Sequence, residues 1–368
     1  MKRIKLYRNI VALGLVLAGF ALHAQPYHKS RKESKTFKVE RRTEVLIENK
    51  YGNIQLINWD KDSISFRINL EVEAKKEAKA KEILESIDFD FISSKQYIEA
   101  KTSFLNEGSF WTDVKDKASS IFSGDNSTQI NYTIYLPDYL EIRIENKYGN
   151  IIMDSHKGPV TIVLSNGDFK AWDLEETNLN LQFGFANIKT IKNGRMDLNY
   201  HSELVLDKAV DLSIESRSSR VRIEKVDNLK LKSSRDKCYL EEVKNLNAVT
   251  SFSYLELEDL GEFITANSKY GDLEIRNIGK AVNKMVIDAD NTDISLNRTG
   301  SQNLDVAITY DEKAGLYYND ELRNKVTEKV EGEEKLVKTT GTLGKGSNGQ
   351  IIKLNATLKS GSMRISTK

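Results

Sequence analysis

The feature that most constrains this chain is a pattern that recurs every 17 or 18 residues through its middle, with a last step of 21 residues. It reads apolar-x-apolar-x-x-apolar, mostly with Gly or Ser two positions before the first apolar residue. Successive copies begin at Ile151, Phe169, Ala186, Leu204, Val221, Cys238, Leu255, Leu273 and Ile294. A short fixed period of this kind indicates similar units stacked on one another.

Each unit is too short to fold by itself. Fixing its backbone costs about 1–2 kcal/mol per residue, while each of its few apolar side chains contributes about 1.5–3 kcal/mol when fully buried. Stacking removes the deficit, because neighbouring units pair their strands about 4.8 Å apart and share one core. We therefore predict an all-β, single-stranded β-solenoid with regular rungs over residues 146–300.

The predicted unit holds two strands joined by a polar turn, and one internal row should contain Leu206, Ile223, Leu240 and Leu257. A three-sided helix of six-residue sides is the main alternative, since three sixes make 18. It ranks second, because it requires an apolar residue at every sixth position on each side, whereas the pattern shows two inward faces.

The regions on either side of the repeats differ from them. The sequence ENKYGNI stands at 48–54 and again at 145–151, so one rung precedes an excursion. Within 25–145 we expect strands, an Ala/Lys/Glu-rich helix over 74–87 and a mobile loop over 106–128. This region should cap the open core. Residues 301–368 should add C-terminal rungs, a charged hairpin at about 318–349 and a final rung.

Residues 1–24 are predicted to be a signal peptide. A basic start is followed by an apolar run, Ile10 to Leu22, of 13 residues, which is too short to span a bilayer. The mature chain shows no transmembrane segment, and no Cys follows the apolar run to carry a lipid. We expect an exported protein of the periplasm, the outer cell surface or the medium.

Charge and cysteine content exclude further classes. The chain has 55 basic and 54 acidic residues, whereas nucleic-acid binding or a general role at anionic membranes needs a basic surface. Cys238 is the single cysteine, so packing alone must hold the fold. It falls on an apolar repeat position, which favours a small buried hydrophobic residue over a reactive thiol.

Several motifs together point to a family. They are Phe37-Lys38-Val39, the two Asn-Lys-Tyr-Gly-Asn-Ile copies, Trp59-Asp60-Lys61, the Ala/Lys/Glu-rich segment and Ile130-Asn131-Tyr132. With the signal peptide, they resemble a family of exported proteins abundant in Bacteroidetes-type bacteria and labelled putative adhesin. The resemblance covers essentially the whole mature chain. It implies a right-handed β-helix and no established reaction, so no site residue is carried over.

Stacking should bring charged side chains together. Carboxylates on neighbouring rungs, namely Glu241, Glu242, Glu258 and Asp259, form a candidate Ca²⁺ site or an acid/base pair acting on sugar. A solvated turn neutralised by Lys208 and Lys225 is the favoured interpretation. A candidate patch for anionic polysaccharide or lipid headgroups consists of Arg217, Arg220, Arg222, Arg235 and Lys237, with ordinary surface charge as the alternative.

Two columns of residues precede each motif strand. The column two positions ahead, which includes Gly149, Gly184 and Ser219, is small, as a tight corner with positive φ or close backbone approach requires. The column three ahead contains aromatic residues such as Phe183 and Phe252. Corner packing is favoured for these rings over a ligand platform.

No spacing for zinc ligands and no phosphate loop is present, so neither catalytic residues nor a cofactor are predicted. The favoured hypothesis is a non-enzymatic, exported scaffold or interaction protein that binds polysaccharide or another envelope protein. A carbohydrate-active β-helix enzyme of lyase or hydrolase type is the alternative, and a sensory envelope protein is the third. The absence of long insertions between Gly149 and Asn297 favours the first, because an enzyme needs walls around a cleft.

Overall fold

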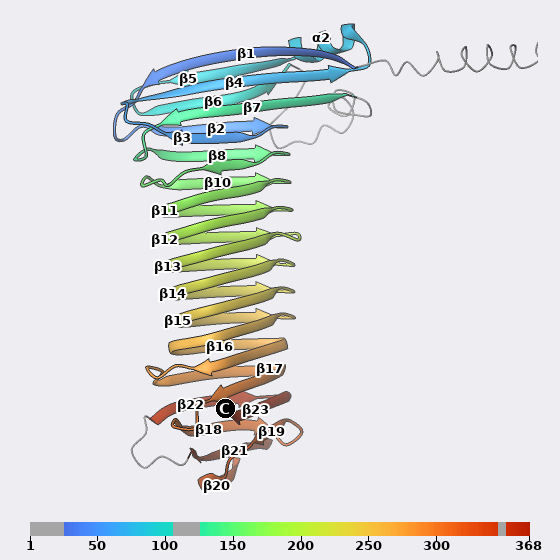
Figure 1. The fold of residues 1–368 in the computed structure, drawn as a ribbon. Coiled ribbons are helices and arrows are strands. Elements are labelled where there is room, and N and C mark those ends of the chain that lie inside the picture. Colours follow the sequence, from blue (N-terminus) through green and yellow to red (C-terminus); the bar gives the residue numbers. More distant parts are fainter. Residues whose placement is uncertain (1–25, 106–125, 345–350) are drawn as a thin grey trace, which may run out of the picture.

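A computed structural model describes residues 26–105, 126–344 and 351–368. It is an all-β rod of stacked coils with a broader sheet at its N-terminal end (Figure 1). The predicted signal peptide and most of the predicted loop at 106–128 lie outside the described residues. Within the described ranges, no helix is long and apolar enough to cross a membrane.

Within its described residues, the N-terminal region contains seven strands and one helix. They are β1 (Tyr27–Lys38), β2 (Glu44–Lys50), β3 (Ile54–Asn58), β4 (Ser63–Ala74), α2 (Glu77–Glu85), β5 (Ile87–Ser93), β6 (Tyr97–Phe104) and β7 (Ser127–Leu136).

The rod follows from β8 to β17. Its strands are β8 (Glu141–Lys147), β9 (Ile151–Met153), β10 (Val160–Ser165), β11 (Asp168–Gln182), β12 (Phe185–Asn199), β13 (Glu203–Arg217), β14 (Arg220–Ser234), β15 (Lys237–Ser251), β16 (Tyr254–Ile278) and β17 (Lys284–Arg298). The C-terminal strands are β18 (Asn303–Asp311), β19 (Gly315–Tyr318), β20 (Leu322–Val330), β21 (Glu333–Leu343), β22 (Ile351–Leu358) and β23 (Gly361–Thr367).

A regular coil is one bent strand rather than two strands joined by a turn, which corrects the sequence-based expectation. In the parallel ladder of β13 and β14, Leu206 pairs with Ile223 before the bend and Leu212 pairs with Leu229 after it. Only Asp207 and Val210 of β13 step out of register at the bend. The polar residues there reverse the chain gradually, so most backbone hydrogen bonds continue around it.

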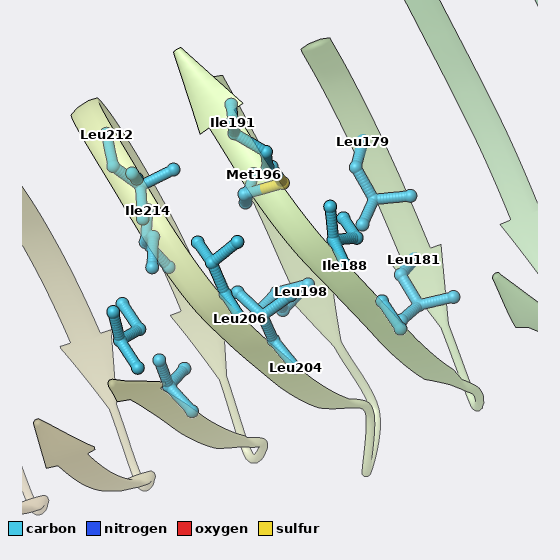
Figure 2. Close-up of a cluster of buried hydrophobic side chains, with 14 of the residues drawn as sticks. Leu179, Leu181, Ile188, Ile191, Met196, Leu198, Leu204, Leu206, Leu212 and Ile214 are labelled. Atoms are coloured by element: carbon cyan, nitrogen blue, oxygen red, sulfur yellow. The ribbon is translucent and has the colours of Figure 1, made fainter. Parts of the chain in front are cut away.

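The predicted internal row is confirmed. Leu206, Ile223, Leu240 and Leu257 are consecutive ladder partners, and each is at most 2% exposed. Figure 2 shows side chains of this core from neighbouring coils, with Leu204 and Leu206 beside the labelled residues of the preceding coil. The buried apolar residues of β13 are Leu204, Leu206, Ala209, Leu212 and Ile214. Successive positions in this list are two, three, three and two residues apart, and each coil has one tight corner and one bend, so the three-sided alternative does not describe the coil.

At the tight corner between coils, positive φ and close backbone approach are requirements on two different residues, whereas the sequence pattern suggested that the small residue meets both. Positive φ belongs to the larger residue of each corner, for example Phe183 at 52° and Arg235 at 58°. The small residue that follows is needed for close approach. A Cβ on Gly184 would lie 2.1 Å from the carbonyl oxygen of Gly167 in the preceding coil, a distance at which backbone atoms clash.

The N-terminal excursion covers the first coils, and its helix is shorter than predicted. β4 continues to Ala74, which pairs with Tyr27 of β1, and β5 already begins at Ile87. The helix α2 is therefore limited to Glu77–Glu85, with Ala80 and Ile83 buried where it packs against β1 and β4. The residues at both predicted ends of the helix belong to strands β4 and β5 instead, where they form ladder pairs.

The C-terminal rung is present, but it is not last in space. β22 lies between β17 and β18, and pairs with both in parallel. β23 likewise lies between β17 and β19. The chain therefore leaves β17, skips one coil position, forms the charged β20–β21 hairpin, and returns to fill the vacant position with its last residues.

Candidate functional site

The bent coil gives the rod two opposite edges. The corner edge consists of the tight turns, which form a column along the right-hand side of the rod in Figure 1. From β8 to β17 its positive-φ residues are Tyr148, Asn166, Phe183, Tyr200, His201, Ser218, Arg235, Phe252, Tyr270 and Asn291. The bend edge consists of the out-of-register residues and their neighbours, such as Asp207 in β13.

Aromatic side chains on the corner edge stack on one another along the rod. Phe183 and Tyr200 have ring centroids 5.2 Å apart, and those of Phe252 and Tyr270 are 4.9 Å apart. About half of each ring is exposed. The rings thus pack at the corner as favoured from the sequence, but against each other on the surface rather than into the core.

The backbone of this column is strained for such residues. All ten φ values lie between 48° and 64°, a region that favours glycine, and each non-Gly residue there costs about 1–3 kcal/mol. Asn relieves part of this cost at Asn166 and Asn291, but Phe and Tyr do not. Large side chains therefore occupy these positions although glycine would adopt the same φ with less strain.

The predicted basic patch is brought together in part. Arg220, Arg235 and Lys237 line one hollow of about 500 Å³ on the corner edge, together with His201, Ser202, Glu203, Ser218 and Ser219. The Arg235 guanidinium lies 5.7 Å from the Phe252 ring centroid. Glu203 pairs with Arg220 at 3.6 Å and also with Arg222.

The other two basic residues point elsewhere. Arg222 lies further along the first side of its coil, where its guanidinium is 5.9 Å from the ring centroid of Tyr239. Arg217 ends β13 on the opposite side of the corner, where it pairs in the ladder with Ser234. The hollow therefore has three basic groups, with Arg217 beside it.

The predicted acidic cluster lies on the bend edge. Glu241, Glu242, Glu258 and Asp259 line a hollow of about 540 Å³ together with Asp207, Glu224 and Glu256. The Lys225 ammonium contacts the Glu242 carboxylate at 2.6 Å, and this hydrogen bond raises the pKa of Lys225. Arg276 contacts Glu258 at 3.4 Å. Among the described residues, no three His, Cys, Asp or Glu side chains are placed to hold a metal ion, so the Ca²⁺ site stays a prediction.

A polar groove runs along the second side of the coils and was not identified from the sequence. Its volume is about 540 Å³, and Phe263 lies at one end. Asn245 donates through Nδ2 to Oδ1 of Asn228, and Asn228 donates likewise to Asp211, both at 2.8 Å. The sequence contained a signal for this groove, because Asp211, Asn228 and Asn245 occupy the same position of consecutive repeats.

The side chains of Cys238 and His156 are buried and have structural roles. The Cys238 thiol is fully buried, and burial raises its pKa to about 12, which confirms the interpretation of a buried hydrophobic residue. His156 is buried, with Nε2 2.7 Å from the carbonyl oxygen of Leu140. Burial lowers the pKa of its imidazole.

Solved structures similar to this chain carry descriptive names, but they superimpose poorly on it. No protein-family model and no curated protein matches the chain. A solved structure named "putative cell adhesion protein", from Clostridium sporogenes, is 12% identical, covers 92% of this chain and 100% of its own, and has a TM-score of 0.19. A "putative adhesin" from Bacteroides fragilis is 10% identical over 92% of this chain and 97% of its own, with a TM-score of 0.24. Superpositions this poor leave function to be argued from the chain itself.

Proposed function

We propose that this protein is a non-enzymatic, exported, adhesin-like scaffold that binds acidic glycans along the corner edge. The observation that supports this most directly is the basic hollow of Arg220, Arg235 and Lys237, which lies between the aromatic pairs Phe183/Tyr200 and Phe252/Tyr270 along the same edge.

The chemistry of the hollow suits a uronate or a sulfated sugar. Guanidinium groups bind carboxylate and sulfate through paired hydrogen bonds, and two of the three basic groups here are arginines. The exposed parts of the stacked rings offer apolar contact to the C–H groups of sugars on either side. An extended polymer suits the edge because the coils repeat about every 4.8 Å.

The enzymatic alternative has less support. A glycosidase needs two carboxyl groups that converge on one bond; Glu242 and Glu258 of the acidic cluster are paired with Lys225 and Arg276, which leaves Glu241 and Asp259 as its candidate pair. The cluster also lies on the bend edge, away from the aromatic pairs.

Binding to polygalacturonate, alginate and neutral dextran tests the proposal, with the same mixtures assayed for polymer cleavage. The corner variant R220E/R235E/K237E should bind the acidic polymers at least about tenfold more weakly, in line with the loss of several charge contacts. The matched control K170E/R195E/K230E makes the same charge change at exposed positions away from the corner edge. Equal binding to dextran, full binding by the corner variant, or cleavage of a polymer would each refute the proposal.

A further inference from the structure

The two edges of the rod carry opposite charge at the same level along its axis. Over β13 to β16, the exposed basic residues of the corner edge are Arg217, Arg220, Arg235, Lys237 and Lys269. Over the same strands, the acidic side chains of the bend edge are Asp207, Glu224, Glu241, Glu242, Glu258 and Asp259. They outnumber the cations on this side of the coils, which are Lys208, Lys225 and Lys244 at the bend, Arg222 in the same hollow and Arg276 beside Glu258. Because each coil has its corner and its bend at opposite ends, the charged stripes lie on opposite sides of the rod.

Part of each stripe lies outside the close ion pairs of the molecule, although Lys225 also attracts Glu224 and Arg217 attracts Glu215. In the described part of the chain, Asp207, Glu224, Glu241 and Asp259 form no ion pair with a cation, and neither do Arg217 or Lys237. Ladder neighbours in a parallel sheet are about 4.8 Å apart, so like charges stacked on consecutive coils repel one another. Each stripe therefore favours a partner that brings a column of opposite charge at the same spacing.

We propose that the partner is a second copy of this chain, which docks its corner edge against the bend edge of its neighbour. Charge complementarity identifies the partner, because a second copy of the chain carries a stripe of the opposite charge and its coils repeat at the same spacing. The two stripes share one axial level, so parallel copies related by a sideways translation match without a shift along the axis. The bend edge offers a hollow of about 540 Å³, which extends onto the first side of the coils and in which Arg222 is the one cation among the lining residues.

This contact differs from a closed dimer. Corner against corner, or bend against bend, would oppose like charges, which disfavours a two-fold pair. A corner-to-bend contact is heterologous, and with translation it leaves one free edge on each side, so it continues into flat rows of parallel rods. The inference goes beyond glycan binding, although it shares Arg220, Arg235 and Lys237 with that proposal, so acidic polymers should compete with association.

Sedimentation velocity of the purified protein from about 1 to 100 µM, in about 20 mM and about 500 mM NaCl, tests the proposal. Exposed charges are screened beyond a few ångströms at high salt, so the weight-average mass should at least double at low salt and return to that of a monomer at high salt. A monomer under all conditions, or association that salt leaves unchanged, would overturn it.

Two charge-reversal variants make the test specific. The bend variant D207K/E224K/E241K has two basic edges, and a second corner variant, R217E/R220E/K237E, has two acidic edges. Each alone should stay monomeric, whereas an equimolar mixture should associate again. The control K170E/R195E/K230E should associate like the natural protein. Association by either variant alone, or none in the mixture of variants that both retain the natural circular dichroism spectrum, would refute the contact.

The same variants separate this inference from the proposed function. The bend variant leaves the basic hollow intact, so it should lose association while keeping the affinity for polygalacturonate. If the bend variant loses association and polygalacturonate binding together, the loss does not come from the edge contact, and the inference fails. If glycan binding fails while association behaves as described, only the glycan proposal fails.

Discussion

Asp236 is a carboxylate buried at a corner of the rod, and its replacement tests how the coils are held together. It is 3% exposed. Its carboxylate accepts hydrogen bonds from the hydroxyls of Ser216 at 2.5 Å and Ser233 at 2.8 Å. It also accepts from the backbone N–H groups of Ser219 at 2.7 Å and Ser234 at 2.9 Å.

D236A leaves the two backbone donors without an acceptor, because they cannot turn away as the hydroxyls can. A buried donor left unsatisfied costs about 1–3 kcal/mol, so the free energy of local opening should fall by roughly 2–6 kcal/mol. D236S provides a matched comparison, since Ser253 of the next coil already accepts from the backbone N–H of Asp236 through its Oγ at 3.2 Å. A serine at 236 can accept from Ser219 in the same way, which should recover about half of the loss.

The assay uses Cys238, the single cysteine, which lies two residues away and is buried. Its labelling by a thiol reagent under native conditions requires opening of this corner. At about 1.4 kcal/mol for each factor of ten, D236A should accelerate labelling roughly 30-fold to 10⁴-fold, and D236S distinctly less. Labelling of D236A at the natural rate, or of D236S as fast as D236A, would refute the reasoning. Equal rates in guanidinium control for the reagent.

Three further predictions concern the thiol, a histidine and the C-terminal coil. Because burial raises the pKa of Cys238 to about 12, the natural protein at pH 8 should resist thiol labelling until it is unfolded; rapid labelling of the folded protein would contradict this. Because burial lowers the pKa of His156, the unfolded chain takes up this proton first as the pH falls through about 6.5. Stability should therefore decrease from pH 7 to 5, and H156Q should flatten the melting temperature over that range, whereas an equally steep fall would argue against it. Deleting residues 351–368 removes the coil between β17 and β18, so both lose a partner and the truncated protein should aggregate; gel filtration and protease resistance like those of the full chain would show that the rod simply shortens.

Sequence periodicity predicted the core because each coil repeats the same alternation. Leu206 and Ile223 could be placed in one row from spacing alone, since parallel strands in register put equal repeat positions side by side. The bend was misjudged for a related reason. Polar residues such as Asp207 and Lys208 have the composition of a turn, and composition does not show that the backbone ladder continues through them.

The candidate sites were predicted less completely. Spacing indicated that Arg220, Arg235 and Lys237 are close, but not that Arg217 lies on the other side of the corner. The ladder of Asp211, Asn228 and Asn245 was overlooked because isolated Asn residues in a repeat resemble ordinary surface polarity. Their mutual hydrogen bonds become apparent only when the outward side chains of adjacent coils are placed together.

Local repetition by itself determined that this chain forms stacked coils around one apolar row, because nearest-neighbour pairing follows from a constant period. Only the tertiary structure decided where the C-terminal coil lies. The last coil is inserted between β17 and β18, and its place depends on contacts between segments distant in sequence. The separation of basic and acidic side chains onto opposite edges likewise depends on how each coil bends, which period and composition leave open.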